Sequence, residues 1–152
     1  MGNDAKIHED TLQHIGRVRE FIFRCTDALI IRAADHDKSK TEPPEAEVFD
    51  DYCKKLKGLV YGSDEYKAVL KEMKPCVDHH YSLNRHHPEH FPNGIQGMSL
   101  IDILEMLCDW RAACERHATG DIRKSVEINQ KRFGYSDELK QVLLNTLEVL
   151  EK

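Results

Sequence analysis

Apolar residues recur every three or four positions along most of the chain, the spacing that places them on one face of an α-helix. The pattern predicts a long first helix over residues 7–34, with apolar positions at Ile7, Leu12, Ile15, Val18, Phe21, Ile22, Cys25, Leu29 and Ile30. A polar segment, Asp35–Lys40, follows this helix. Pro43-Pro44 then prevents the helix from continuing, because proline has no N–H to donate.

Two further helices are predicted in the middle of the chain. The segment Pro43-Pro44-Glu45 can open a helix that runs to about Leu56, since proline is tolerated in a first turn. Ser63 is a good N-cap for a third helix, whose apolar pattern extends to Leu83. Pro75 lies inside that pattern, so we expect it to kink the helix rather than end it.

Ser99 marks the start of a fourth helix. Its side chain can cap the helix, and Asp102 stands at the third helical position, where it completes a capping box. The apolar pattern then continues from Leu100 to about His117. Thr119-Gly120 follows, and glycine is the usual residue just beyond a helix end. We therefore expect a glycine cap there.

Two short helices complete the chain. Asp121 caps one that runs to about Arg132, and Ser136 caps another that runs through Leu150. No segment shows a convincing strand pattern. The sequence therefore predicts an all-α fold, a bundle of about six helices. A chain of 152 residues suits one hydrophobic core, so we expect residues 1–152 to form a single domain.

The composition is that of an ordinary globular protein. Hydrophobic residues make up 40% of the chain and charged residues 32%, and the net charge is −5 with histidine neutral. An acidic chain is poorly suited to coat nucleic acid, and no apolar run approaches the ~20 residues that cross a bilayer. We expect neither membrane binding nor bulk nucleic-acid binding, and the sequence leaves the oligomeric state open.

The cysteines favour a cytoplasmic location. There are five, an odd number, spread widely and without a C-x-x-C pair. This distribution is typical of reduced thiols that are mostly buried as small apolar side chains. The N-terminal segment Met1–Lys6 is polar and lacks the apolar stretch of a secretory signal.

His36-Asp37 is the first candidate for chemistry. Imidazole nitrogens and carboxylate oxygens are common metal ligands, and an irregular helix end would let both neighbours reach one ion. Lys40 follows three residues after Asp37, where its ammonium could contact a phosphate oxygen. Taken alone, the stretch D-H-D-K-S-K also fits a solvated helix end.

Asp109 is the second candidate, because it lies in the largely apolar segment Leu100–Trp110. A carboxylate inside a central helix is costly unless it is paired or bound to a metal. Asp102 already has a role as a helix cap, whereas Asp109 has none. We expect Asp109 to be a metal ligand, with Glu105 as a supporting partner behind the ligands. The alternative is an ion pair between Asp109 and an arginine.

Histidines are concentrated in one short stretch. The chain has nine, and five of them lie within residues 78–90, at His79, His80, His86, His87 and His90. Histidine is neither a strong helix former nor a common surface solubiliser. Metal binding, phosphate binding and proton transfer are its usual functions in such clusters. The spacing alone does not decide which of these histidines are ligands.

Several cations lie near these segments in an acidic chain, namely Lys40, Arg85, Arg111, Arg116 and Arg132. Cations around a metal suggest a small anionic ligand, and phosphate is the commonest. We expect Lys40, Arg85 and Arg111 to contact it, together with Asn84. Surface ion pairs with the chain's acids are the alternative explanation for such residues.

The order His14, His36-Asp37, Asp109 resembles that of the HD-domain phosphohydrolase superfamily, which is all-helical and uses metal ions to cleave phosphate esters. The segment His36–Lys40 resembles the HD-x-x-K stretch of this superfamily, and Leu107–Ala113 resembles the helix that carries its last aspartate ligand. The resemblance implies an HD-like helical bundle. It also implies a metal site formed by His14, His36, Asp37 and Asp109.

Other parts of the chain extend this resemblance. The segment His86–His90 is loosely similar to the histidine pair of the cyclic-dinucleotide phosphodiesterase branch, although Phe91-Pro92-Asn93-Gly94 replaces that branch's D-G-x-G-Y-P continuation. His80, His86 and His87 are therefore candidate ligands of a second ion. The whole string also resembles an uncharacterised family of small phage and bacterial proteins, which would place a phage-encoded chain in the bacterial host cell.

Three hypotheses for the function follow. The first is hydrolysis of a nucleotide-like phosphate ester with one or two divalent transition metal ions (Mn, Fe, Zn, Co or Ni), in which Asp37, Lys40, His80 and His87 are catalytic. The second is a di-iron oxygenase, because some HD-fold proteins hold two irons with about six His and Asp ligands. The third is a phage protein that binds a nucleotide without turning it over.

Overall fold

The computed structural model describes residues 2–57, 59, 63–116 and 120–151. The described residues form six α-helices and three short 3-10 helices, with no strand among them, so the all-α prediction is confirmed. The chain divides into two compact units, residues 1–35 and residues 36–152. Each unit is described by itself, and a single domain over 1–152 stays a prediction.

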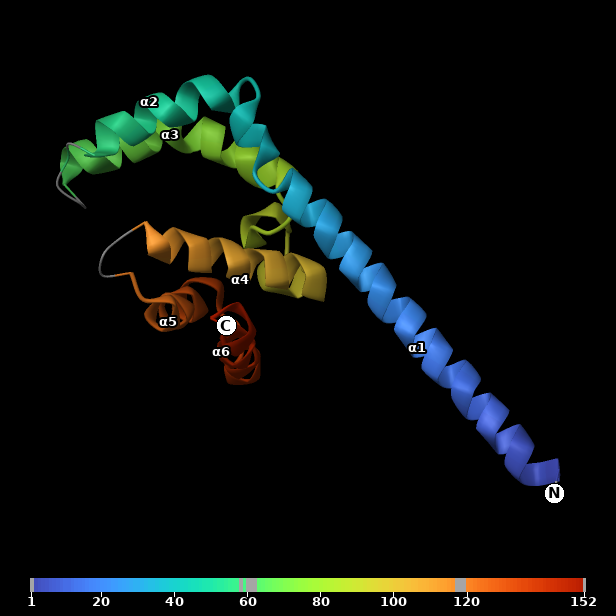
Figure 1. Ribbon diagram of the computed structural model, residues 1–152. Helices are drawn as coiled ribbons and strands as arrows, with labels where there is room; N and C mark the ends of the chain where they lie inside the picture. Colours follow the sequence, from blue (N-terminus) through green and yellow to red (C-terminus); the bar gives the residue numbers. More distant parts are fainter. Residues whose placement is uncertain (1, 58, 60–62, 117–119, 152) are drawn as a thin grey trace. The chain divides into compact units, whose positions relative to one another are not determined.

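The first unit is one helix, α1 (Gly2–Asp35), which confirms the long helix predicted over residues 7–34 (Figure 1). On its surface, Glu20 forms ion pairs with Arg17 and Arg24, which lie one turn away on either side. Such pairs between neighbouring turns support an exposed helix by a few tenths of a kcal/mol each, roughly 0.2–0.5.

The second unit begins with a helical pair. After the 3-10 helix η1 (Lys38–Thr41), α2 (Glu45–Lys57) packs against α3 (Asp64–Leu83). Ser63 caps α3 as predicted, because its side chain accepts a hydrogen bond from the backbone N–H of Tyr66. The helix continues through Pro75, also as predicted.

A loop with two 3-10 helices, η2 (Pro88–His90) and η3 (Gly94–Gly97), leads to α4 (Leu100–Glu115). The predicted capping box at the start of α4 is present in full. The Ser99 side chain accepts from the backbone N–H of Asp102, and the Asp102 carboxylate accepts from the backbone N–H of Ser99.

The end of α4 differs from the prediction. The helix stops at Glu115 with Arg116 as its C-cap, somewhat before the predicted end near His117. A 3-10-like last turn closes it, in which the backbone N–H of Arg116 donates to the carbonyl of Ala113 at 3.2 Å. The glycine cap was predicted at Thr119-Gly120, and Thr119 lies outside the described residues.

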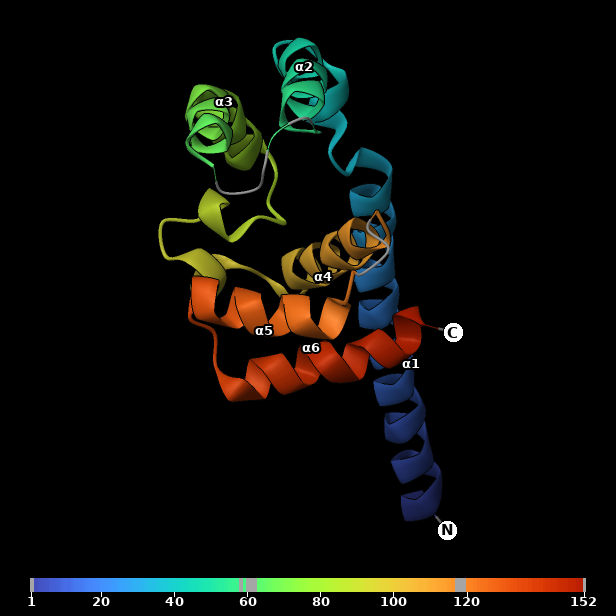
Figure 2. The same ribbon diagram turned by 90° about the vertical axis from the view of Figure 1, so that its left-hand side faces the viewer.

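Two helices, α5 (Ile122–Phe133) and α6 (Asp137–Leu150), complete the unit, with Asp121 and Ser136 as their N-caps. Gly134 ends α5 in the left-handed conformation, at φ 68°, which glycine adopts without strain. In Figure 2, α5 lies between α4 and α6, and it packs against both of them.

The hydrophobic core lies among these three helices. Its fully buried members come from all of them and include Leu107, Val126 and Leu147, each with 0% of its surface exposed. Tyr135 closes one end of the core, where its hydroxyl donates to the carbonyl of Val126 at 2.5 Å. This core holds α4 in place, and α4 carries two of the carboxylates described below.

The prediction that the cysteines are mostly buried is wrong. Cys25 and Cys108 are exposed, and Cys76 and Cys114 are only half-buried. Larger apolar side chains occupy the core positions of α4 instead, so that Met106 and Leu107 are buried while their neighbour Cys108 faces outward. Among the described helices, none combines the length and the apolar character that spanning a bilayer requires.

Replacing Leu147 with alanine tests the position of this core. The Leu147→Ala variant should lose about 2–5 kcal/mol of unfolding free energy, because it removes buried methyl groups and leaves a cavity. The matched control on the same helix is Val149→Ala, because Val149 is 71% exposed. Its change should stay within about 0.5 kcal/mol in urea unfolding. Equal losses in the two variants would contradict the described core.

Candidate metal centre

Asp37 stands at an irregular junction, as the sequence suggested. The helix α1 ends at Asp35, η1 begins at Lys38, and Asp37 between them has φ 53° and ψ 19° in the left-handed region. This conformation is uncommon for a residue other than glycine, although aspartate tolerates it better than most. Strained backbone of this kind is often found at functional sites.

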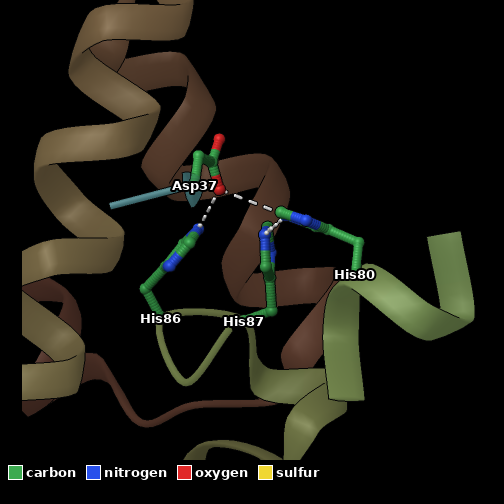
Figure 3. Close-up of side chains that lie close together, drawn as sticks. All are labelled: Asp37, His80, His86 and His87. Carbon is green, nitrogen blue, oxygen red and sulfur yellow. Dashed lines mark hydrogen bonds and ion pairs between the residues drawn. The ribbon is translucent and has the colours of Figure 1, made fainter. Parts of the chain in front are cut away.

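Three histidines face the Asp37 carboxylate (Figure 3). His80 Nε2 lies 3.2 Å from Asp37 Oδ1, and His86 Nε2 lies 3.4 Å from the same oxygen. His87 completes the group, with its Nε2 atom 3.0 Å from His80 Nε2. Each of these four residues offers one ligand atom, and all four atoms lie within 4.8 Å of one another. That spacing suits a single bound cation.

A second group shares Asp37 with the first. It consists of His36, Asp37 and Asp109, whose ligand atoms also lie within 4.8 Å of one another. His36 Nε2 is 3.7 Å from Asp37 Oδ2 and 3.8 Å from Asp109 Oδ1. Asp37 therefore presents one oxygen to the first group and the other to the second. Such an arrangement can hold one or two ions.

Glu105 supports the histidines of both groups from behind. Its Oε1 atom lies 2.9 Å from His36 Nδ1 and 3.1 Å from His86 Nδ1. The hydrogen bond from His36 Nδ1 to this carboxylate would leave the Nε2 lone pair of His36 for a metal. The prediction that Glu105 is a supporting partner matches this position, one turn of α4 before Asp109.

Glu45 is a buried carboxylate that was not among the site residues predicted from the sequence. It has no exposed surface, and its two oxygens receive three hydrogen bonds. His79 Nδ1 lies 2.7 Å from Oε1, while His80 Nδ1 (2.9 Å) and Ser39 Oγ (2.8 Å) contact Oε2. In the sequence, Glu45 is an acidic residue that follows two prolines, and this pattern is ordinary at the start of a helix. It therefore gives no signal of a functional role.

The pKa values reflect this packing of charges. Burial would raise the pKa of Asp37, but interactions with His80 and Lys40 outweigh it and hold that pKa well below its usual range. Asp109 raises the pKa of His36 to about 9 against the opposing effect of burial. Burial, with His86 and His80 adding to it, lowers the pKa of His87 to about 3. A neutral His87 can offer a lone pair to a metal.

Buried polar atoms in the centre fit a bound cation. Asp37 Oδ1, His86 Nδ1 and His86 Nε2 are inaccessible to solvent and have no hydrogen-bond partner of proper geometry among the described residues. Buried polar atoms in this state are costly and uncommon in native structures. A divalent cation among the Nε2 atoms and Asp37 would satisfy two of these three atoms directly.

Lys40 contacts the centre directly, and each of the other residues predicted to contact a substrate has a partner in the structure. Lys40 Nζ donates to Asp37 Oδ2 at 2.6 Å. Asn84 donates to Ser39 Oγ at 2.9 Å and to the carbonyl of His80 at 2.8 Å. Arg85 forms a two-bonded pair with Asp102, at 3.1 Å for each bond.

Arg111 forms an ion pair with Glu115 at 2.9 Å, along α4. His14 lies on α1, in the first unit, with an exposed side chain. The ligand groups described above do not include His14, and its role as a ligand stays a prediction. Of the remaining clustered histidines, His79 points to Glu45, and His90 Nδ1 lies 2.9 Å from the carbonyl of Tyr81.

The His36–Asp109 interaction predicts a pH dependence in metal-free protein. A histidine whose pKa is raised on folding adds stability that is fully present below pH 6.5, the ordinary histidine pKa, and is lost as the pH rises through about 9. The melting temperature should fall across that window. In Asp109→Asn the pKa of His36, measured by NMR titration, should move back toward 6.5 and the slope should flatten.

Asp64→Asn is the control for this measurement, because the Asp64 side chain is 98% exposed. It should leave the titration of His36 unchanged. An ordinary pKa for His36 in the metal-free wild-type protein would contradict the described geometry.

Comparisons with known proteins give one match. No curated protein and no solved structure matches the chain. The family of unknown function DUF5662 matches residues 3–151, which include every candidate ligand described above. Because this match spans nearly the whole sequence, the chain belongs to the DUF5662 family.

Proposed function

We propose that the chain is a metal-dependent phosphohydrolase that acts on a nucleotide-like phosphate ester. The observation that carries the proposal is the pair of ligand groups that share Asp37, one with three histidines and one with His36 and Asp109. The imidazoles of these groups suit Fe, Zn, Co or Ni, and their carboxylates also suit Mn. When bound, such an ion would lower the pKa of a water molecule and polarise a phosphoryl oxygen.

Exposure differs across the centre and indicates where a substrate would approach. The side chains of His80 and His86 are 3% and 1% exposed, so they form its inner wall. On the other side, His36, Asp109 and Lys40 are 32%, 28% and 35% exposed. A phosphate group approaching from that side would meet Lys40, whose ammonium contacts Asp37.

Each residue then has a chemical role in the proposal. Lys40 would exchange part of its contact with Asp37 for a phosphate oxygen and so neutralise the charge of the ester. His36, Asp37 and Asp109 would hold an ion on the exposed side, and His80, His86 and His87 would orient one on the buried side. A histidine that is not engaged as a ligand could protonate the leaving group.

Hydrolysis of a nucleotide panel by the full chain, reconstituted with Mn²⁺, Co²⁺ or Zn²⁺, tests the proposal. We expect release of phosphate or nucleoside with at least one member of the panel. Asp37→Asn should lower the rate by more than ~100-fold, because it removes the carboxylate that both ligand groups share. Chelation of the metal should have a similar effect.

Asp50→Asn is the matched control, since Asp50 is 72% exposed and pairs with Lys54 in the next turn. It should keep full activity. Activity that persists in Asp37→Asn after the metal is removed would contradict the proposal. So would an intact nucleotide that co-purifies and is never turned over, because that result indicates a binding protein.

A di-iron oxygenase is a second candidate, favoured by the number of ligands. The two groups together contain six His and Asp residues, namely His36, Asp37, His80, His86, His87 and Asp109. Metal analysis of protein purified without chelator separates the two candidates. For a hydrolase we expect one or two divalent metal ions and release of phosphate without oxygen uptake. Two irons per chain, with oxygen uptake, would favour the oxygenase instead.

A further inference from the structure

Glu45 is the most deeply buried carboxylate in the second unit, and every contact of its oxygens is with a hydrogen-bond donor. It belongs to neither ligand group, and it reaches the centre only through His80. Ser39 Oγ donates to Glu45 Oε2, so this oxygen acts as a hydrogen-bond acceptor, and it also lies within hydrogen-bond distance of His80 Nδ1.

This constraint fixes the proton of His80. Because Glu45 Oε2 lies 2.9 Å from His80 Nδ1, that nitrogen must carry the hydrogen. With a cation bound, Nε2 would offer its lone pair to that cation, and Nε2 is the atom that lies 3.2 Å from Asp37 Oδ1. The carboxylate thus turns the ligand atom of His80 toward the ion site.

The neighbours of His80 Nδ1 agree with this assignment. Asn84 Nδ2 lies 3.0 Å from Nδ1, but its two hydrogens are directed to Ser39 Oγ and to the carbonyl of His80. Ser39 Oγ lies 3.1 Å from Nδ1 and donates its own hydrogen to Glu45. Glu45 is thus the acceptor for the Nδ1–H of His80.

His79 holds the other oxygen of the same carboxylate. Its Nδ1 atom lies 2.7 Å from Glu45 Oε1, and its side chain is 40% exposed, whereas that of His80 is 3% exposed. Two adjacent histidines, His79 and His80, therefore each contact a different oxygen of the Glu45 carboxylate. With both oxygens engaged, the Glu45 carboxylate has little freedom to rotate away from His80.

We propose that Glu45 is a positioning residue, whose buried carboxylate holds His80 with its hydrogen on Nδ1 and so sets the affinity of the buried ligand group for a transition metal. The metal part of this inference rests on the proposed function, while the tautomer of His80 does not. Carboxylates that hold a ligating histidine in this way commonly change metal affinity by about 10- to 100-fold.

Glu45→Gln tests the inference, because the amide keeps the size of the side chain but replaces one acceptor oxygen with a donor. In the full chain, Zn²⁺ affinity measured by competition with a chromogenic chelator should fall by about 10- to 100-fold. Glu47→Gln, on an exposed position of the same helix, should leave the affinity unchanged. Equal affinities for Glu45→Gln and wild type would overturn the inference.

A double-mutant cycle separates positioning from a general effect on the fold. If Glu45 acts through His80, then Glu45→Gln should cause no further loss of Zn²⁺ affinity in the His80→Ala background. Losses that simply add would overturn the inference, because they would show that Glu45 acts independently of His80.

The ¹⁵N chemical shifts of the His80 ring in metal-free wild-type protein decide the tautomer without any variant. We expect a hydrogen on Nδ1, and a ring whose only hydrogen is on Nε2 would overturn the inference even if Glu45→Gln fails to fold. Failure of the wild-type chain to bind any transition metal would contradict both the proposed function and the metal part of this inference. Equal Zn²⁺ affinities with an unchanged tautomer would contradict this inference alone.

Discussion

The Asp37 carboxylate, held among imidazole rings at a left-handed turn, is the interaction on which the site depends. One of its oxygens faces His80 and His86, and the other accepts from Lys40 and faces His36. Negative charge in a half-buried position is costly unless cations or hydrogen-bond donors surround it. The segments that surround Asp37 must therefore be held close together, and α2, α3 and α4 do so.

The core and the site are connected through α4. One face of this helix buries Leu107 against α5 and α6, and its residues Glu105 and Asp109 lie beside the histidines. The packing that stabilises the unit is thus also what fixes these two carboxylates. On the opposite side, α2 places Glu45 behind His80. The rings are held between two carboxylate-bearing helices, and the ion sites would lie between them.

The sequence predicted the helices well because their signals are local. Ser63, Ser99 and Ser136 each cap the helix that they were expected to cap, and these caps depend only on the next few residues. The ligand candidates His36, Asp37 and Asp109 also meet as predicted. Glu45 and the pairing of Arg85 with Asp102 were not foreseen, because both depend on contacts between segments far apart in the chain.

The backbone at position 37 restricts which residues can occupy it, independently of any role in chemistry. At φ 53° a side chain branched at Cβ is strongly disfavoured, while glycine, asparagine and aspartate are accepted. Of these three, aspartate alone brings a negative charge. Glutamate, the usual conservative replacement, keeps the charge but fits the turn poorly. Aspartate thus meets two separate requirements at this position, the backbone conformation and the negative charge. Among all substitutions at position 37, almost none should meet both.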